Sequence, residues 1–469
     1  MRNWMKRLPR GASRALAAAA LAGAAVAGSA PAADAFCGFF VAKADGQLFN
    51  EASKVVMARD GSRTVLTMVN DYQGDPTDFA MVIPTPTVLS RDQINVGETS
   101  VIDHLDAYSA PRVVKYDDPN PCGPPEKRLF ERNLVSSVQP RDEAGAARRA
   151  ALGVTVEAEY TVGEYDILIL SAAESGGLQT WLDENGYRTP EAARDVLGSY
   201  IRQGMKFFVA RVNLAEQAKR GGAYLRPLQI AFESEKFMLP IRLGTVNAKG
   251  KQDLLLFTLT RTGRVELANY RTLRIPSDVS VPLYVQTAFG DFYKAMFDTA
   301  LEKSGGKAAF TEYAWDMNWC DPCAADPLTV SQLRSLGVFW LKPEPVDAQG
   351  APRPSGGAVD VFVTRLHLRY DAETHPEDLR LTETGDRQNF QGRYVTRHPY
   401  VGAASCEEGR AYRARLGKRF REEAQTLASL TGWPMEEIRA RMAETGQSLE
   451  GLPEPKPFWI ELWKEPLGE

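Results

Sequence analysis

The chain has 469 residues, with 56 Lys and Arg against 60 Asp and Glu, and therefore a formal net charge of −4. An acidic protein repels nucleic-acid phosphates and anionic lipid headgroups, which argues against binding to nucleic acid or to a membrane surface. The length exceeds the ~250–300 residues that one hydrophobic core accommodates, so we expect two or three domains.

Residues 1–35 have the three parts of a secretory signal peptide. Basic residues begin the segment, an Ala-rich apolar stretch covers 15–27, and Ala33-Asp34-Ala35 places small residues where a signal peptidase cuts. We predict cleavage after Ala35 and export to the periplasm or the extracellular space; a retained anchor is the alternative, for which the apolar stretch is short. Cleavage removes five basic residues and one acidic residue. No later segment has the ~18 successive apolar residues of a transmembrane helix.

Residues 36–150 are predicted to form a β-rich N-terminal domain. Strands at 54–59 and 63–69 flank Asp60-Gly61, which suits a tight hairpin because glycine tolerates a positive φ. Residues 79–84 are almost entirely apolar, which predicts a strand that is buried on both faces. The remaining element expected in this domain is a helix at 101–108.

Residues 151–306 are predicted to form an α+β domain. It begins with a hairpin that turns at Gly163, and a helix over 191–202 has Thr189 as its N-cap and Pro190 in its first turn. The other expected elements are helices at 178–184 and 289–303 and strands at 207–212, 228–232, 237–243, 254–260, 265–267 and 281–285. Residues 79–84 and 237–241 are similar apolar segments that each contain a proline, which would fit an old duplication.

Residues 307–400 are predicted to form a β-rich region that contains a close pair of cysteines and a long strand at 359–370. On this strand Arg365, His367 and Arg369 share one face. They could bind an anion, although a solvent-exposed strand face is the simpler interpretation. Residues 401–469 are predicted to be a helical C-terminal region with two amphipathic helices. The whole pattern predicts an α+β fold, rich in mainly antiparallel sheets, in two or three domains with a helical C-terminal part.

Five cysteines remain after cleavage, and each is a candidate for a structural disulfide in an oxidising compartment: Cys37, Cys122, Cys320, Cys323 and Cys406. The odd number leaves at least one of them unpaired or joined to another molecule, and spacing does not decide which. A long bridge such as Cys37–Cys122 is worth about 4–5 kcal/mol in the loop-entropy model, against about 2 kcal/mol for a Cys320–Cys323 ring. If one bridge stabilises the fold, the long one is the better candidate.

The most specific chemical motif in the chain is Trp319-Cys320-Asp321-Pro322-Cys323. The pattern resembles the active site of thioredoxin-like oxidoreductases, in which Cys320 would be the attacking thiol and Cys323 the resolving thiol. Nearby aspartates would raise the thiol pKa, Pro327 would interrupt a following helix, and residues 310–316 do not look like the apolar strand that precedes the motif in those enzymes. Zinc is a weaker alternative because a second pair of ligands is missing. We predict no metal and no cofactor.

Several sequence segments together resemble the exported bacterial domain-of-unknown-function family 2330. They are residues 36–40, 78–84, 320–323, 365–370 and 388–395, and the resemblance covers most of the mature chain. It implies export and a fold shared by the family, and it brings no activity or site residue. We therefore expect a non-catalytic, disulfide-stabilised envelope module that binds a protein or a small molecule. A thiol–disulfide oxidoreductase is the alternative.

Overall fold

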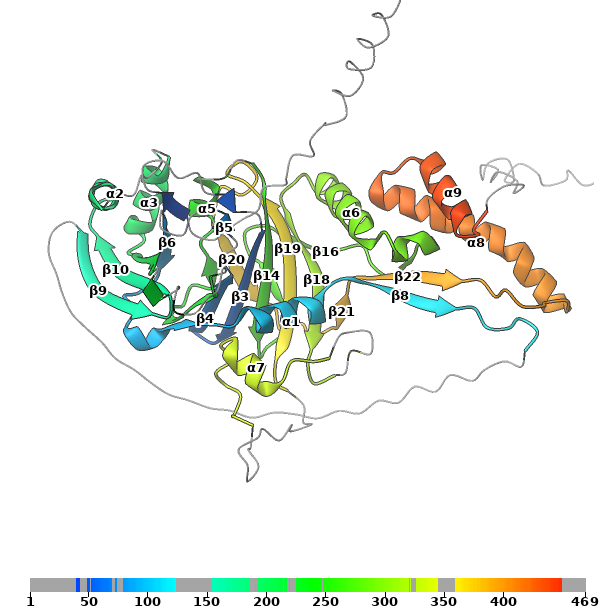
Figure 1. Ribbon diagram of the computed structural model, residues 1–469, viewed down its shortest axis with the longest axis horizontal. Helices are drawn as coiled ribbons and strands as arrows, with labels where there is room; N and C mark the ends of the chain where they lie inside the picture. The colour runs from blue at the N-terminus through cyan, green and yellow to red at the C-terminus, as the bar shows by residue number, and fades with distance from the viewer. Residues whose placement is uncertain are drawn as a thin grey trace, which may run out of the picture. The chain divides into compact units, whose positions relative to one another are not determined.

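The computed structural model describes residues 39–42, 49–50, 52–69, 72–73, 79–123, 154–185, 190, 192–213, 215–216, 219, 225–246, 248, 250–319, 321, 326–344 and 359–448. These residues all belong to one compact unit, residues 33–469 (Figure 1). The predicted α+β fold with mainly antiparallel sheets and helices at the C-terminal end is confirmed. None of the described helices is long and apolar enough to cross a bilayer.

A five-stranded antiparallel sheet forms one layer of the unit. Its strands, in spatial order, are β1 (Phe39–Ala42), β6 (Phe79–Thr85), β11 (Lys206–Val212), β10 (Tyr165–Ala172) and β9 (Val154–Val162). Three helices pack through Leu182, Leu197 and Leu243 on the face that carries Val82 and Val209. They are α2 (Ser175–Glu184), α3 (Ala193–Arg202) and α5 (Arg242–Val246).

A larger mixed sheet forms the second layer. Its strands, in order, are β16 (Arg271–Arg274), β18 (Ala308–Asp316), β19 (Phe362–Tyr370), β14 (Gln252–Thr260), β3 (Ala52–Asp60), β4 (Arg63–Val69), β12 (Leu228–Glu233) and β7 (Ile94–Val96), and β21 (Phe390–Gln391) also pairs with β18. Neighbours are antiparallel except for β14 with β3 and β16 with β18. Met57, Leu66 and Ile230 on one face join Ile83 and Phe208 of the first sheet in a common core. The two sheets therefore pack face to face.

Three helices cover the other face of the large sheet. They are α1 (Thr99–Ser109), α7 (Val330–Ser335) and α6 (Phe289–Lys303). Leu105 of α1 and Leu333 of α7 pack with Phe257 and Val363 of the sheet, whereas Phe297 of α6 belongs to a separate cluster that includes the C-terminal helices. This face is consequently not exposed to solvent.

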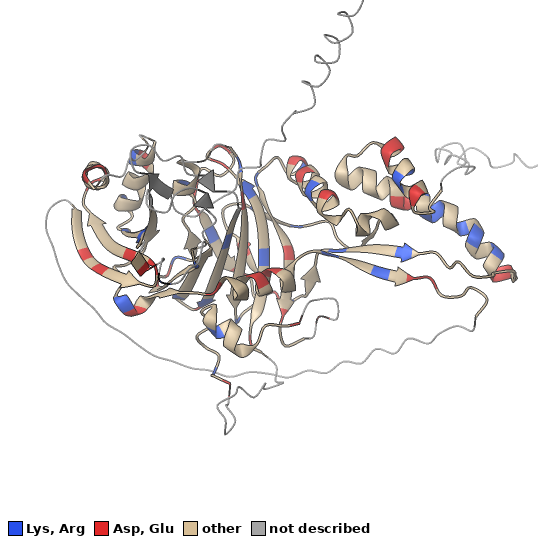
Figure 2. Ribbon diagram, in the orientation of Figure 1, with Lys and Arg blue, Asp and Glu red and all other residues tan. Residues whose placement is uncertain are grey.

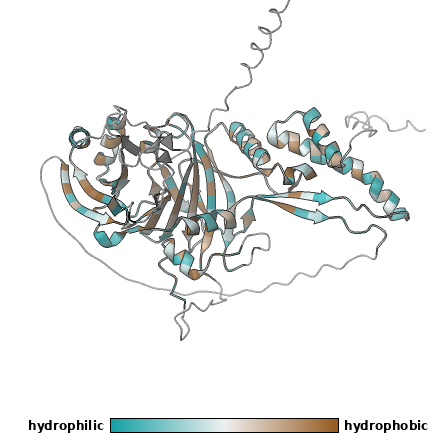
Figure 3. Ribbon diagram, in the orientation of Figure 1, coloured by the Kyte–Doolittle hydropathy of each residue, from teal (hydrophilic) through white to brown (hydrophobic). Residues whose placement is uncertain are grey.

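Smaller elements complete the unit. Short sheets are formed by β13 (Met238–Leu239), β20 (Leu379–Glu383) and β15 (Val265–Leu267), by β17 (Val279–Ser280), β22 (Arg393–His398) and β8 (Arg112–Asp117), and by β2 (Phe49–Asn50) with β5 (Tyr72–Gln73). Helices α8 (Glu407–Thr431) and α9 (Met435–Glu444) pack with α6 through Phe420, Leu427 and Ile438 (Figure 1). Figure 3 shows hydrophobic and hydrophilic bands alternating along α8, as expected of a helix with one covered side.

Local sequence signals predicted several elements correctly. Gly61 and Gly163 have positive φ values of 61° and 60° and close the β3–β4 and β9–β10 hairpins. The two expected C-terminal helices are α8 and α9, and Gly432 ends α8 with a φ of 71°. The regions 36–150 and 151–306, expected from the sequence to be separate domains, share sheets. β3 of the first region pairs with β14 of the second, and β6 pairs with β11.

Other local predictions were wrong. The strand expected at 237–243 is the two-residue β13 followed by α5, and the strand expected at 281–285 is a 3-10 helix, Leu283–Gln286. Short apolar runs are compatible with either structure, and here prolines at 240 and 282 end the extended segments. Helix α3 begins at Ala193 with Ala192 as its N-cap, so Pro190 precedes the helix; Thr189 lies outside the described residues.

Candidate functional site

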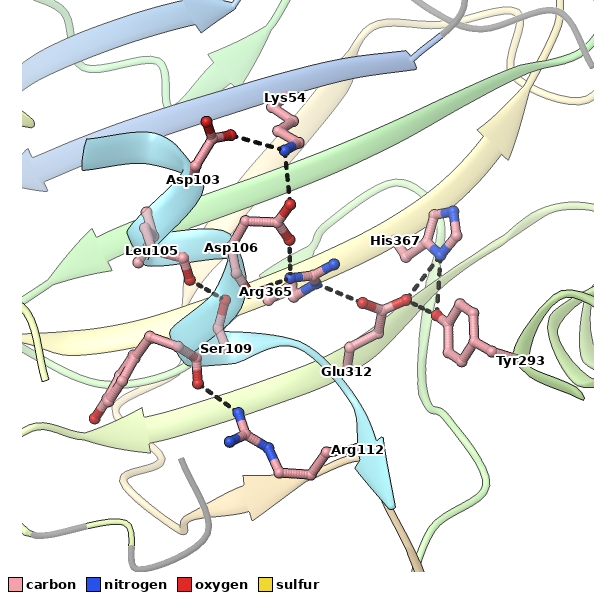
Figure 4. A network of polar contacts seen from close by, with 11 residues as sticks. Lys54, Asp103, Leu105, Asp106, Ser109, Arg112, Tyr293, Glu312, Arg365 and His367 are labelled. Carbon is pink, nitrogen blue, oxygen red and sulfur yellow. Dashed lines mark hydrogen bonds and ion pairs between the residues drawn. The ribbon is translucent and has the colours of Figure 1, made fainter. Parts of the chain in front are cut away.

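A network of charged side chains lies on the face of the large sheet that α1 and α6 cover (Figure 4). At its centre Glu312 of β18 is fully buried. Its carboxylate accepts hydrogen bonds from Arg365 Nε at 2.5 Å, from His367 Nδ1 at 2.7 Å and from the Tyr293 hydroxyl. Burial raises the pKa of this carboxyl, but the charges on Arg365 and His367 outweigh burial and hold the pKa below its ordinary value. Glu312 is therefore ionised in the fold.

His367 of β19 contacts two carboxylates and the aromatic rings of Phe297 and Tyr293. Its Nδ1 faces Glu312, its Nε2 lies 3.5 Å from Asp253 of β14, and its ring stacks on Phe297 of α6 with centroids 3.8 Å apart. Burial lowers the pKa of His367, whereas Glu312 and Asp253 raise it, and the net result is a pKa above the ordinary value. In its charged form both ring nitrogens donate hydrogen bonds.

Arg365 connects this centre to α1. Its Nη1 lies 2.5 Å from the Asp106 carboxylate and donates to the Asp106 carbonyl at 3.0 Å. Lys54 of β3 contacts the same carboxylate at 2.7 Å and Asp103 at 3.3 Å (Figure 4). Figure 2 shows the acidic residues of α1 beside the basic residues of the strands behind it. The charges thus attach α1 to the sheet.

The expectations for Arg365, His367 and Arg369 as a solvent-exposed face or an anion site were wrong. The face is covered, and protein carboxylates occupy the positions that an anion would take. Arg369 makes a two-point contact with Asp253 at 2.8 and 2.9 Å and a further contact with Asp298 of α6 at 2.6 Å. Glu312 was not predicted because period-two alternation reports the polarity of a strand face but not the helix that will cover it.

The cysteines that the structure describes form a disulfide. Cys122, which follows β8, is bonded to Cys406, the N-cap of α8, with a Cα–Cα distance of 6.0 Å across 284 residues of sequence. This long bridge is not the Cys37–Cys122 pairing considered from the sequence, which was wrong because Cys122 has Cys406 as its partner. Beside the bridge Asp118 accepts hydrogen bonds from Tyr412 and Arg419 of α8, both at 2.6 Å. These contacts attach α8 to the end of β8.

Cys320, Cys323 and Cys37 lie outside the described residues, but the surroundings of the Cys pair are described. Asp321 is buried and accepts hydrogen bonds from the Tyr313 hydroxyl at 3.2 Å and from Gln391 Nε2 at 2.8 Å. Residues 310–316 belong to the buried strand β18, which corrects the expectation that no such strand precedes the motif. Residues 326–329 are not helical, and α7 begins only at Val330. A helix dipole that would stabilise a Cys320 thiolate is not provided by these residues.

A cavity of about 270 Å³ lies between the two sheets. Leu66 and Phe232 line it from the large sheet, Pro84 lines it from β6 of the first sheet, and Met205 and Met238 complete its apolar wall. The other lining residues are Pro86, Gln203, Ser234, Glu235, Lys236 and Pro240. The cavity has the features of a small-molecule site, which are an apolar wall and a few polar groups.

The sequence analysis did not predict that these lining residues form a site. The one sequence feature related to the cavity is the similarity between residues 79–84 and 237–241. The two similar apolar segments at 79–84 and 237–241 each supply a proline to the cavity, Pro84 and Pro240. Their likeness was visible in the sequence, but their proximity depends on how the two sheets pack. Among the described residues, no group of three or more His, Cys, Asp and Glu side chains is arranged to hold a metal ion.

The comparison with protein-family models agrees with the family resemblance noted in the sequence. The family model of uncharacterized proteins conserved in bacteria, DUF2330, matches residues 31–382, well over half of the chain. Residues 388–395 and helices α8 and α9 lie beyond the residues that the family model matches. The Cys122–Cys406 bond therefore joins the matched part of the chain to the C-terminal helices. No curated protein and no solved structure matches the chain.

Proposed function

The chain belongs to the DUF2330 family of bacterial proteins, and we propose that it acts outside the cytoplasm as a non-catalytic binding protein. In this proposal a disulfide stabilises the fold, and the ligand occupies the cavity between the two sheets. The observation that carries the proposal is the cavity itself: about 270 Å³ of space bounded mainly by apolar side chains from both sheets. Gln203, Glu235 and Lys236 on its rim are exposed, so the cavity is open to solvent and a small molecule can enter it.

Export is supported by two independent features. Residues 1–35 have the pattern of a cleaved signal peptide. The Cys122–Cys406 bond requires an oxidising compartment to form and persist, and disulfides are rare in the bacterial cytoplasm.

The test of export is mass spectrometry on protein released from the native periplasm or medium. The expected product begins at Phe36 and yields a Cys122–Cys406 linked peptide under non-reducing digestion. Full-length, fully reduced protein found in the cytoplasm would overturn this part of the proposal. The same digest, with thiol trapping, reports on Cys320 and Cys323: mixed disulfides to other proteins at Cys320 would favour the oxidoreductase alternative.

The test of ligand binding uses native mass spectrometry of the intact, oxidised protein. We expect a small molecule to co-purify with the wild type and to be lost in Met238→Trp, because the larger side chain fills the cavity. Val401→Trp is the matched control, since Val401 is 98% exposed and a tryptophan there leaves the cavity unchanged. Equal small-molecule occupancy in the wild type and in Met238→Trp would contradict the assignment of the cavity as the binding site.

A further inference from the structure

The part of the molecule around the disulfide is basic, although the whole chain is acidic. We call this part the basic arm and define it as residues 115–123, which end β8 and follow it, and residues 397–422, which run from the end of β22 into α8. It contains eight Lys and Arg against five Asp and Glu, a net charge of +3, whereas the chain has −4. Surface charges act over about 8–10 Å at physiological salt, so the local balance decides what the basic arm attracts.

The two parts of the basic arm are fastened to each other. Strands β8 and β22 pair along their length, and the Cys122–Cys406 bond joins the segment after β8 to the N-cap of α8. The Tyr412 hydroxyl of α8 donates to Asp118 at 2.6 Å and accepts a hydrogen bond from the Tyr400 N–H at 2.8 Å. The charges on this end of α8 therefore keep a fixed position beside the ends of the two strands.

The cations of α8 form one continuous basic segment. Residues 409–421 contain six Lys and Arg and no Asp or Glu, and Figure 2 shows these cations as successive blue bands along the helix. Intervals of eight and eleven residues return to nearly the same direction on an α-helix, so Arg410, Lys418 and Arg421 lie on one side of α8. The fully exposed members of the segment are Arg410, Arg413, Arg415 and Lys418.

Few protein carboxylates neutralise this segment. Lys418 pairs with Glu422 at 3.7 Å, and Arg419 pairs with Asp118 at 2.6 Å. The ion pairs between described residues involve none of the other four cations, which are Arg410, Arg413, Arg415 and Arg421. The acidic residues of the arm that remain lie outside the segment, and two of them are in the first turn of α8, where the positive end of the helix dipole offsets part of their charge: Asp117, Glu407 and Glu408.

The basic arm also exposes apolar side chains. Val401, between β22 and α8, is 98% exposed. Tyr116 of β8 is 40% exposed, and the guanidinium of Arg397 on the paired strand lies 5.2 Å from the centre of its ring. Tyrosine rings beside cations, with an aliphatic side chain close by, are typical of segments that lie in the headgroup region of a bilayer.

This combination favours one kind of partner. A soluble polyanion offers phosphates to the arginines but gives Val401 no apolar surroundings. A bilayer with anionic phospholipid offers both, because lipid phosphates lie at its surface and acyl chains begin directly below them.

We propose that the basic arm docks on the surface of a bilayer that contains anionic phospholipid, with the cations of α8 against the lipid phosphates and with Val401 and Tyr116 in the headgroup region. The disulfide and Asp118 hold the two sets of side chains together for this contact. The inference is independent of the cavity and of its ligand.

The experiment measures the partition of the oxidised mature protein onto vesicles by co-sedimentation. Vesicles of phosphatidylglycerol mixed with phosphatidylcholine are compared with vesicles of phosphatidylcholine alone. We expect binding to the anionic vesicles, weaker binding as salt is added, and little binding to the neutral vesicles.

Two variants test the two components of the contact. Combined Arg410→Gln, Arg413→Gln and Arg415→Gln should lower the partition coefficient roughly 100-fold, since each cation near an anionic surface contributes about fivefold. Val401→Ser should lower it about tenfold, the loss expected when a side chain of this size no longer leaves water. The matched control removes the same charge at exposed positions outside the basic arm and should bind as the wild type does: Arg194→Gln, Arg202→Gln and Lys251→Gln.

Each other outcome would overturn the proposal. No binding to the anionic vesicles, or equal binding to both kinds of vesicle, would refute an anionic bilayer as the partner. An equal loss in the triple variant and in its matched control would show that overall charge, and not the basic arm, attracts the lipid. Binding to inorganic polyphosphate that displaces the vesicles, together with an unchanged partition in Val401→Ser, would identify a soluble polyanion as the partner instead.

Discussion

Replacing Glu312 with glutamine tests whether the charged network under α1 and α6 stabilises the protein. The carboxylate accepts hydrogen bonds from Arg365, His367 and Tyr293, and it is fully buried. A glutamine side chain has one acceptor oxygen and an NH₂ group that can only donate. The substitution therefore places a donor against at least one of the cationic donors and removes the negative charge between them.

The magnitude follows from the surroundings of Glu312. Removing one partner of a buried ion pair costs about 3–5 kcal/mol, because the remaining charge is left uncompensated. Arg365 keeps Asp106 as a partner and His367 keeps Asp253, at 2.5 and 3.5 Å. We therefore expect the free energy of unfolding to fall by about 3 kcal/mol, at the lower end of that range.

The assay is urea unfolding of the oxidised protein at pH 7, followed by circular dichroism and by tryptophan fluorescence. Glu302→Gln on the exposed side of α6 is the matched control and should change the free energy of unfolding by less than ~0.5 kcal/mol. If Glu312→Gln unfolds within ~1 kcal/mol of the wild type with an unchanged slope, the network contributes little and the reasoning is refuted.

Three further predictions follow from the disulfide and from two buried titratable groups. Replacing Cys122 and Cys406 with serine should lower the free energy of unfolding by about 5.5 kcal/mol in the loop-entropy model, and equal urea midpoints for the variant and the oxidised wild type would contradict this. The pKa of His367 is raised in the fold, so its charged form contributes to the free energy of unfolding fully below the unfolded pKa of ~6.5, and this contribution is lost as pH rises through the folded pKa. His367→Gln should remove this pH dependence from the free energy of unfolding. A curve of stability against pH that is the same as in the wild type would argue against the role of His367. Burial raises the pKa of Glu423 on α8 to about 7, so the stability that protonated Glu423 contributes below its unfolded pKa is lost as pH rises through about 7. Glu423→Gln should therefore unfold at a higher urea concentration than the wild type at pH 8, but not at pH 4. A lower urea midpoint for the variant at pH 8 would contradict the raised pKa.

Much of the local structure was predictable because it depends on residues that are close in sequence. The hairpin at Gly61 requires a positive φ that glycine tolerates, and the apolar run that forms β6 is buried because it has no polar face to expose. The helical C-terminal part follows from the spacing of its apolar residues. The same reasoning failed where short apolar runs had no period, as in the segment that became β13 and α5.

The sequence by itself determined most of the helices and strands, the acidic balance, the signal-peptide pattern and the number of cysteines, since each is a property of composition or of neighbouring residues. Tertiary structure decided which elements meet. It paired β14 with β3, whose partners such as Asp253 and Ala52 are 201 positions apart, joined Cys122 to Cys406, and placed α1 and α6 over Arg365 and His367. It also formed a cavity whose walls come from both sheets. A residue pattern records which side of a strand is polar, but the partner that covers that side is set by long-range packing between segments far apart in the chain.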